Sequence, residues 1–292
     1  MLTVSGCGST KRSAQQDIAP AGTLKALLAR PGRDVAIVAG TSDYSPGPIR
    51  FSFLVIRNDG RSVMRPQARL WVSTGLSERP FTETTASLER VGVPGGYADA
   101  LDVTHLYMAH FAVPKSGKYW VLAEPVGGQP IQALGNLIVK AKTDAPALGS
   151  KAFPSRNPTI ASAGGDLAKL TTRVPPDRAL LRYSVAESLA AHKPFVLVFA
   201  TPKFCTSRTC GPVVDVVDRV RQQFARTGIR FIHVEIYENN NPSLGVNRWV
   251  HEWKLPTEPF VFLVGRDGRI KAKFEGSVSV AELAAAVRAK LA

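Results

Sequence analysis

Cysteine is scarce in this chain, with three in 292 residues, and this scarcity excludes a disulfide-rich secreted scaffold. No run of 18 or more apolar residues occurs either, so the sequence predicts no transmembrane helix. Acidic residues are few relative to basic ones, 23 against 37, which gives a formal net charge of +14. The basic residues are scattered and form neither a cluster nor a base-stacking motif, so we expect no nucleic-acid partner. A diffusely basic surface is instead suited to an anionic envelope surface.

The overall composition is that of a globular protein, with 45% hydrophobic and 21% charged residues. The length of 292 residues allows two domains. Short runs with alternating apolar and polar residues fill 34–142 and predict an all-β domain of the antiparallel sandwich kind. Residues 77–100 read as a long loop within it. Segment 143–176 is rich in Pro, Gly, Ser and Ala and predicts a linker. Segment 1–33 predicts a flexible tether.

The pattern changes in 177–292. A continuous apolar strand is expected at 193–200, followed by a helix that has Pro212 at its first position. A second strand follows at 229–237, and the remainder predicts a short helix, a hairpin and a closing amphipathic helix at 279–291. The expected order of elements is therefore β-α-β-α-β-β-α.

Two of the three cysteines lie between the first strand and helix of this half, in the run TPKFCTSRTCGPV. Thr209-Cys210-Gly211-Pro212-Val213 resembles the active-site motif of the thioredoxin-like superfamily, in which Cys210 matches the attacking cysteine. Val213 stands where that family has its second cysteine, so Cys205 is the candidate partner. The stretch PKSGKYWVLAEP loosely resembles immunoglobulin-like domains. The fold class that these resemblances imply is an immunoglobulin-like sandwich followed by an α/β thioredoxin-like domain.

The residues themselves also indicate thiol chemistry at Cys210. A thiol at a helix N-terminus faces unpaired N–H groups and the positive end of the helix dipole, and both favour the thiolate. Lys203 and Arg208 add positive charge nearby. We therefore expect a thiol–disulfide exchange enzyme with Cys210 as the attacking thiolate and Cys205 as the resolving cysteine, acting on protein thiols and disulfides.

The resemblance further implies a substrate-binding role for four residues. Family members have a cis-proline opposite the active cysteine, and Pro259, preceded by Glu258, matches that place. Gly211 and Pro212 complete the predicted substrate-binding set. We expect no cofactor and no metal ion.

Three alternatives stay open. The cysteine spacing also resembles peroxiredoxins of the bacterioferritin-comigratory type, which would make Cys205 the peroxide-attacking cysteine, Cys210 the resolving cysteine and Thr201 the group that orients the peroxide. A closed Cys205–Cys210 disulfide in a non-catalytic binding module is the second. Copper binding, with His233 or His251 as a further ligand, is the third and the least favoured.

The third cysteine, Cys7, follows Val4-Ser5-Gly6, and this stretch resembles the lipobox of bacterial lipoproteins. The resemblance implies a lipid anchor at Cys7 that tethers the chain to a membrane. With a reactive cysteine pair, this predicts an extracytoplasmic protein of the bacterial cell envelope.

Overall fold

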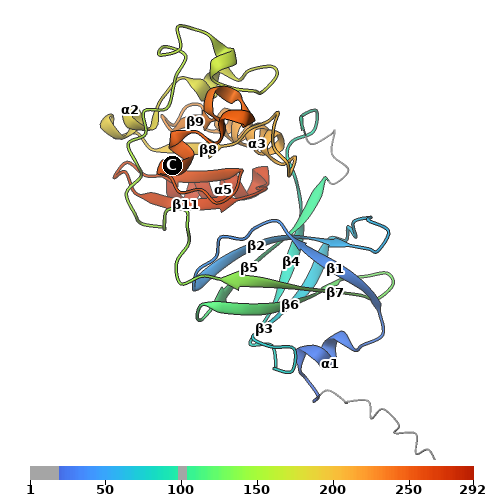
Figure 1. The fold of residues 1–292 in the computed structure, drawn as a ribbon. Coiled ribbons are helices and arrows are strands. Elements are labelled where there is room, and N and C mark those ends of the chain that lie inside the picture. The colour runs from blue at the N-terminus through green and yellow to red at the C-terminus, as the bar shows by residue number, and fades with distance from the viewer. Residues whose placement is uncertain (1–19, 98–103) are drawn as a thin grey trace, which may run out of the picture.

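The first half of the chain forms a closed β-barrel in the computed structural model, which describes residues 20–97 and 104–292 (Figure 1). The barrel strands lie in the order β1-β2-β5-β4-β3-β6-β7. Their bounds are Arg33–Ala39 for β1, Gly47–Ile56 for β2, Gln67–Ser73 for β3, Thr82–Arg90 for β4, His105–Val113 for β5, Gly117–Pro125 for β6 and Ile131–Val139 for β7.

Alternating side chains of the strands fill the barrel. In β2, Ile49, Phe51, Phe53 and Val55 are buried at every second position, because successive residues of a strand point to opposite faces. Phe53 stacks on Tyr107 of β5 with ring centroids 5.3 Å apart. The short helix α1 (Leu24–Leu28) packs outside the barrel in a small apolar cluster of its own.

The expected fold class, a sandwich joined to a thioredoxin-like α/β domain, is wrong for the chain as a whole. The immunoglobulin-like sandwich is replaced by a barrel, closed where β1 pairs in parallel with β7. Alternating strands look alike in sandwiches and barrels, and only this long-range pairing separates them. The expected loop at 77–100 is also wrong in part, because β4 lies within it.

The second half contains a four-stranded sheet in the order β11-β10-β8-β9. β8 and β9 are parallel, whereas β10 is antiparallel to both β8 and β11. The strands span Phe195–Phe199 (β8), Arg230–Val234 (β9), Phe260–Val264 (β10) and Ile270–Glu275 (β11), and the helices span Val185–Ala190 (α2), Cys210–Gln223 (α3), Arg248–Glu252 (α4) and Val280–Lys290 (α5). Short 3₁₀ helices lie at Leu167–Lys169, Arg178–Leu181, Glu238–Asn240 and Pro242–Leu244.

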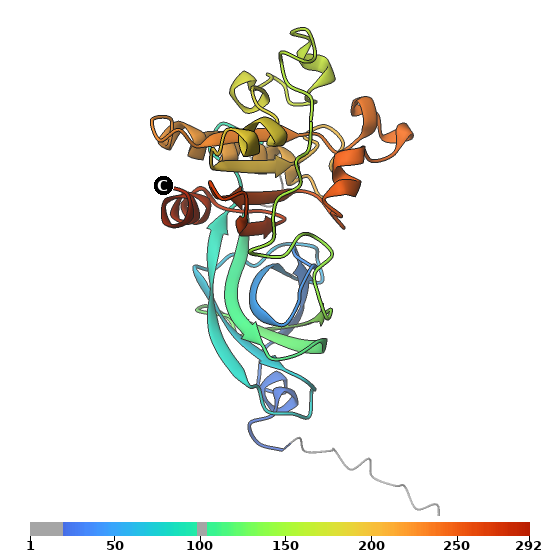
Figure 2. The same cartoon turned by 90° about the vertical axis from the view of Figure 1, so that its left-hand side faces the viewer.

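This sheet is covered on both faces (Figures 1 and 2). Val196 and Val198 of β8 face a core shared with α3 and α5. Phe195, Leu197 and Phe199 face the opposite core, which contains Trp253 beside α4 and Val185 of α2. Burial on both faces explains the continuous apolar run in the sequence.

The segment 143–176 runs along this second unit, irregular apart from the 3₁₀ helix Leu167–Lys169 (Figure 2). Several of its side chains are buried, among them Ser155, Asn157 and Thr171. Ser155 accepts a 2.9 Å hydrogen bond from the indole Nε1 of Trp253. The segment therefore packs against the sheet unit over much of its length.

Barrel and sheet unit contact each other through a polar interface. Arg50 of β2 pairs with Glu282 of α5 at 2.7 Å and donates to the backbone carbonyls of Glu275 and Ser277. The carboxylate of Glu275 in turn accepts the backbone N–H of Ser42, at 2.8 Å. Within the described ranges, no helix is long and apolar enough to cross a membrane.

Candidate thiol site

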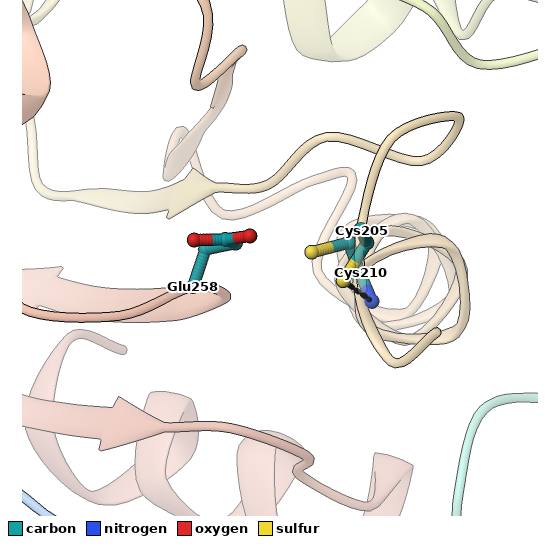
Figure 3. Close-up of side chains that lie close together, drawn as sticks. All are labelled: Cys205, Cys210 and Glu258. Carbon is teal, nitrogen blue, oxygen red and sulfur yellow. Dashed lines mark hydrogen bonds between the residues drawn. The ribbon is translucent and has the colours of Figure 1, made fainter. Parts of the chain in front are cut away.

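Two free thiols lie together where β8 leads into α3 (Figure 3). Cys205 is half-buried in the loop between the two elements, and Cys210, the first residue of α3, is fully buried. The backbone N–H of Cys210 donates to the Cys205 sulfur at 3.4 Å. The two sulfurs and a carboxylate oxygen of Glu258 all lie within 4.8 Å of one another.

The surroundings of Cys205 stabilise its thiolate. A hydrogen bond from the Cys210 thiol, together with bonds from Ser207 and from the backbone N–H groups of Cys210 and Thr209, lowers the pKa of Cys205 to about 6, against the opposing effect of burial. The Ser207 hydroxyl lies 3.2 Å from this sulfur. A thiolate fraction near neutral pH is what a nucleophilic cysteine requires.

Cys210 has the opposite character. Burial raises the pKa of the Cys210 thiol far above its usual range, and the neighbouring Cys205 raises it further. A second anion on the buried Cys210 sulfur, beside the Cys205 thiolate, is strongly disfavoured. Near neutral pH, Cys205 is therefore a partly buried thiolate and Cys210 is a buried neutral thiol.

Glu258 faces the two cysteines from the loop before β10 (Figure 3). Both cysteine sulfurs lie within 4.8 Å of one of its carboxylate oxygens. Burial raises the pKa of this half-buried carboxyl group, and the negative charge of Cys205 raises it further. Burial also raises the pKa of Tyr237, with added contributions from Glu258 and both cysteines. Tyr237 packs edge-on against Phe204, so the aromatic pair borders the cysteine loop.

A buried ion pair fixes the first turns of α3. Arg173 contacts Asp215 at 2.7 Å, and the other oxygen of Asp215 accepts the backbone N–H of Tyr97, also at 2.7 Å. Tyr97 belongs to the loop between β4 and β5, so a barrel loop reaches the cysteine-bearing helix. Gly211 lies directly beneath its ring, because a Cβ atom there would approach a Tyr97 ring carbon to 2.5 Å.

The structure brings Cys205, Cys210 and Glu258 together. Of the other predicted site residues, Gly211 contacts Tyr97, Pro212 lies buried in α3, and Pro259 is buried after a cis peptide bond.

Two residues of the alternative hypotheses are also buried, and Cys7 lies outside the described residues. Thr201 is fully buried beside the cysteine loop, and its hydroxyl has no partner among the described residues. His233 is buried with Nε2 2.9 Å from the carbonyl of Ala200, and burial lowers its pKa. Its contacts are with Thr171 and Ala200, not with sulfur.

Reasoning from the sequence missed Ser207, Arg173 and Tyr97. Ser207 was adjacent to the motif, and a hydroxyl two residues from a cysteine is a usable signal for a thiolate contact. The Arg173–Asp215 pair and the Tyr97 loop join segments far apart in the chain, so no local pattern indicates them.

Comparison with known proteins identifies no family. No family model matches the chain, and no curated protein matches it. One solved structure with similarity is a Paenibacillus sp. cycloisomaltooligosaccharide glucanotransferase in complex with cycloisomaltoheptaose, at 16% identity. The match covers 47% of this chain and 18% of that one, with a TM-score of 0.24. Overlap this low supports no argument about fold or function.

The assignment to a thioredoxin-like, immunoglobulin-containing envelope lipoprotein is therefore corrected. It depended on a Cys-Gly-Pro triplet, a proline, a hairpin and a lipobox-like tetrapeptide, which are too short to define a family. The comparisons give no support to the class labels oxidoreductase and lipoprotein, which followed from that assignment. A location in the bacterial envelope stays a prediction because it depends on Cys7.

Proposed function

We propose that this chain carries out thiol–disulfide exchange on protein substrates, with Cys205 as the attacking thiolate and Cys210 as the resolving thiol. The observation that supports this most is the arrangement of the pair: a partly buried loop cysteine whose sulfur accepts N–H and O–H hydrogen bonds, and a fully buried thiol within 4.8 Å of it. These roles are the reverse of those that the Cys-Gly-Pro motif suggested.

The reaction has two steps. The Cys205 thiolate attacks one sulfur of a substrate disulfide, forms a mixed disulfide and expels the other substrate sulfur as a thiolate, which takes up a proton. Cys210 then loses its proton and attacks the Cys205 sulfur, which releases the second substrate thiol and leaves a Cys205–Cys210 disulfide. The substrate gains two electrons, the protein loses two, and a dithiol reductant such as dithiothreitol returns the protein to its starting state.

The burial of Cys210 explains why the steps follow in this order. A fully buried thiol does not meet a protein disulfide directly, whereas Cys205 in the loop is only partly buried. Once Cys205 is in a mixed disulfide, its negative charge is gone. Burial still raises the Cys210 pKa, but the added repulsion from Cys205 is then removed, and formation of the second thiolate becomes easier.

Reduction of a disulfide-linked model protein such as insulin by dithiothreitol tests this proposal. We expect the wild-type chain to accelerate the reaction, Cys205→Ser to show only the uncatalysed rate, and Cys210→Ser to lose turnover after one attack. Cys7→Ser is the matched control because it removes the third cysteine and leaves the pair intact, so its rate should equal that of wild type. Turnover by Cys205→Ser at the wild-type rate would contradict the proposal.

Peroxide reduction is the second candidate, because it uses the same order of cysteines and because the buried Thr201 hydroxyl has no partner among the described residues. The electrostatics disfavour it. No cation is among the groups that lower the Cys205 pKa, and a carboxylate oxygen of Glu258 lies within 4.8 Å of the Cys205 sulfur. Consumption of hydrogen peroxide at a rate above that of free cysteine would favour this candidate over exchange.

A further inference from the structure

We infer that the reduced site binds a thiophilic d¹⁰ cation, for which Zn²⁺ is the natural probe, with Cys205, Cys210 and Glu258 as ligands. The three donor atoms come from three separate places, the β8–α3 loop, the start of α3 and the loop before β10, and lie within 4.8 Å of one another. This binding goes beyond the proposed exchange reaction and does not depend on it.

The donor set selects the class of ion. Two sulfurs and one carboxylate oxygen suit zinc and other thiophilic ions, whereas calcium and magnesium prefer a shell of oxygens. Three protein ligands also leave the fourth tetrahedral position for water or another small ligand.

Metal binding requires the two sulfurs to move slightly closer together. With zinc–sulfur bonds of about 2.3 Å in a tetrahedron, two sulfur ligands lie roughly 3.8 Å apart. The present upper limit of 4.8 Å exceeds this by up to about 1 Å, given the same geometry. We expect the Cys205 loop to move on metal binding, not Cys210. Cys210 lies in the first turn of α3, and contacts of Asp215 with Arg173 and Tyr97 hold that helix in place.

The positive charge of the ion also stabilises the three ligands electrostatically. Two thiolates and a carboxylate would concentrate three negative charges in a largely buried place, and a dication cancels most of that charge. Bound metal would occupy both sulfurs, so a loaded chain could not attack a disulfide. Conversely, closure of the Cys205–Cys210 disulfide would remove two of the three ligands. Metal occupancy and thiol oxidation therefore exclude each other.

Titration of the reduced, chelator-treated full chain tests the site without any disulfide substrate. Zn²⁺ affinity is measured by competition with a chromophoric chelator, and Co²⁺ serves as a coloured substitute whose thiolate charge-transfer absorption reports sulfur ligands. We expect one ion per chain with that absorption. Loss of either cysteine should weaken binding by roughly a hundredfold and Glu258→Gln by roughly tenfold, since even outer-sphere changes weaken metal sites by about 10–100-fold.

Three controls make the outcome decisive. Glu238→Gln removes an exposed carboxylate on a nearby segment and should leave the affinity unchanged, as should Cys7→Ser. Wild-type chain alkylated at its thiols should not bind, and it needs no mutation that risks misfolding. The inference is overturned if reduced chain binds no ion, if alkylated chain binds equally well, or if Glu258→Gln has wild-type affinity. Metal binding without exchange activity would instead contradict only the proposed function.

Discussion

At the scale of single residues, two cysteines of the same loop-and-helix junction have opposite properties because of their surroundings. Hydrogen bonds from the Cys210 thiol, Ser207 and two backbone N–H groups lower the pKa of Cys205 to about 6. Burial raises the pKa of Cys210. The prediction from the sequence used the motif, the helix N-terminus and the nearby Lys203 and Arg208. It placed the thiolate on Cys210, whereas the hydrogen bonds and exposure favour Cys205.

The first prediction concerns pH. In the metal-free, reduced chain, alkylation of Cys205 by iodoacetamide should increase as pH rises through about 6, because the thiolate is the reactive form. Cys210 should stay unmodified over the same range. Peptide mapping by mass spectrometry after short exposure gives the rate at each cysteine. Cys210→Ala should move the midpoint for Cys205 upward, since it removes the strongest thiolate contact. A midpoint near 8.5 in wild type would contradict the assignment of the thiolate.

The second prediction concerns Gly211. Gly211→Ala places a Cβ atom 2.5 Å from the Tyr97 ring, so the ring or the helix must shift. We expect a loss of about 1–3 kcal/mol of unfolding free energy, as for other overpacked sites. Urea denaturation measures it. Tyr97→Ala should recover part of this loss when the two changes are combined, whereas strictly additive effects would show that the ring is not the obstacle.

At the scale of elements, much of the second half was predictable. The strand expected at 193–200 contains β8, and the closing helix α5 begins after its expected cap Ser279, whose hydroxyl accepts the Glu282 N–H. These elements have strong local signals, namely a continuous apolar run and a capping residue. Strand β4, with the sequence TETTASLER, has no such local signal, because only one of its residues is fully buried. Closure of the barrel depends on pairing between β1 and β7, which local periodicity does not encode.

In the candidate site, too, residues with a local sequence signal were predictable and long-range contacts were not. Cys205, Cys210, Glu258 and Pro259 carry local signals and were identified from the sequence. The roles predicted for the two cysteines differ from those proposed above, because exposure and hydrogen bonding depend on how the loop folds over the helix. The Asp215 contacts were also missed, because Arg173 and Tyr97 are 42 and 118 positions away in the chain.

The third prediction concerns this ion pair, which anchors α3. The side chains of Arg173 and Asp215 are 17% and 2% exposed, so loss of one partner leaves a buried charge. Asp215→Ala should cost about 3 kcal/mol or more of unfolding free energy by urea denaturation. The control is Asp267→Ala, which breaks the exposed pair with Lys271 and should cost below about 1 kcal/mol. Equal effects of the two variants would contradict the anchoring role.

At the scale of the whole molecule, the barrel and the sheet unit are joined by charged contacts that far-separated segments supply. One of them is the pair of Arg50 with Glu282, at 2.7 Å. Burial alone would raise the pKa of Glu282, but hydrogen bonds from Arg50 and His110 lower it to about 2. The interface therefore depends on an ionised carboxylate, and the barrel loop that carries Tyr97 adds a second contact next to the thiol site.

The fourth prediction follows from that pKa. Because the folded pKa of Glu282 lies below its unfolded value of about 4.5, the pair stabilises the fold fully above pH 4.5. That contribution, about 3 kcal/mol at most, is lost as pH falls toward 2. Urea denaturation of wild type and Glu282→Gln across this range measures it. The difference in stability between the two should shrink as pH falls, and a constant difference would exclude Glu282 as its source.

The most direct test of the central claim is to identify the cysteine that carries the substrate. Reduced Cys210→Ser and Cys205→Ser chains are each mixed with a disulfide-linked peptide, quenched in acid and mapped by mass spectrometry. We expect a mixed disulfide on Cys205 in the Cys210→Ser chain and no adduct in the Cys205→Ser chain. An adduct on Cys210 in the Cys205→Ser chain, with the Cys210→Ser chain unmodified, would contradict the account.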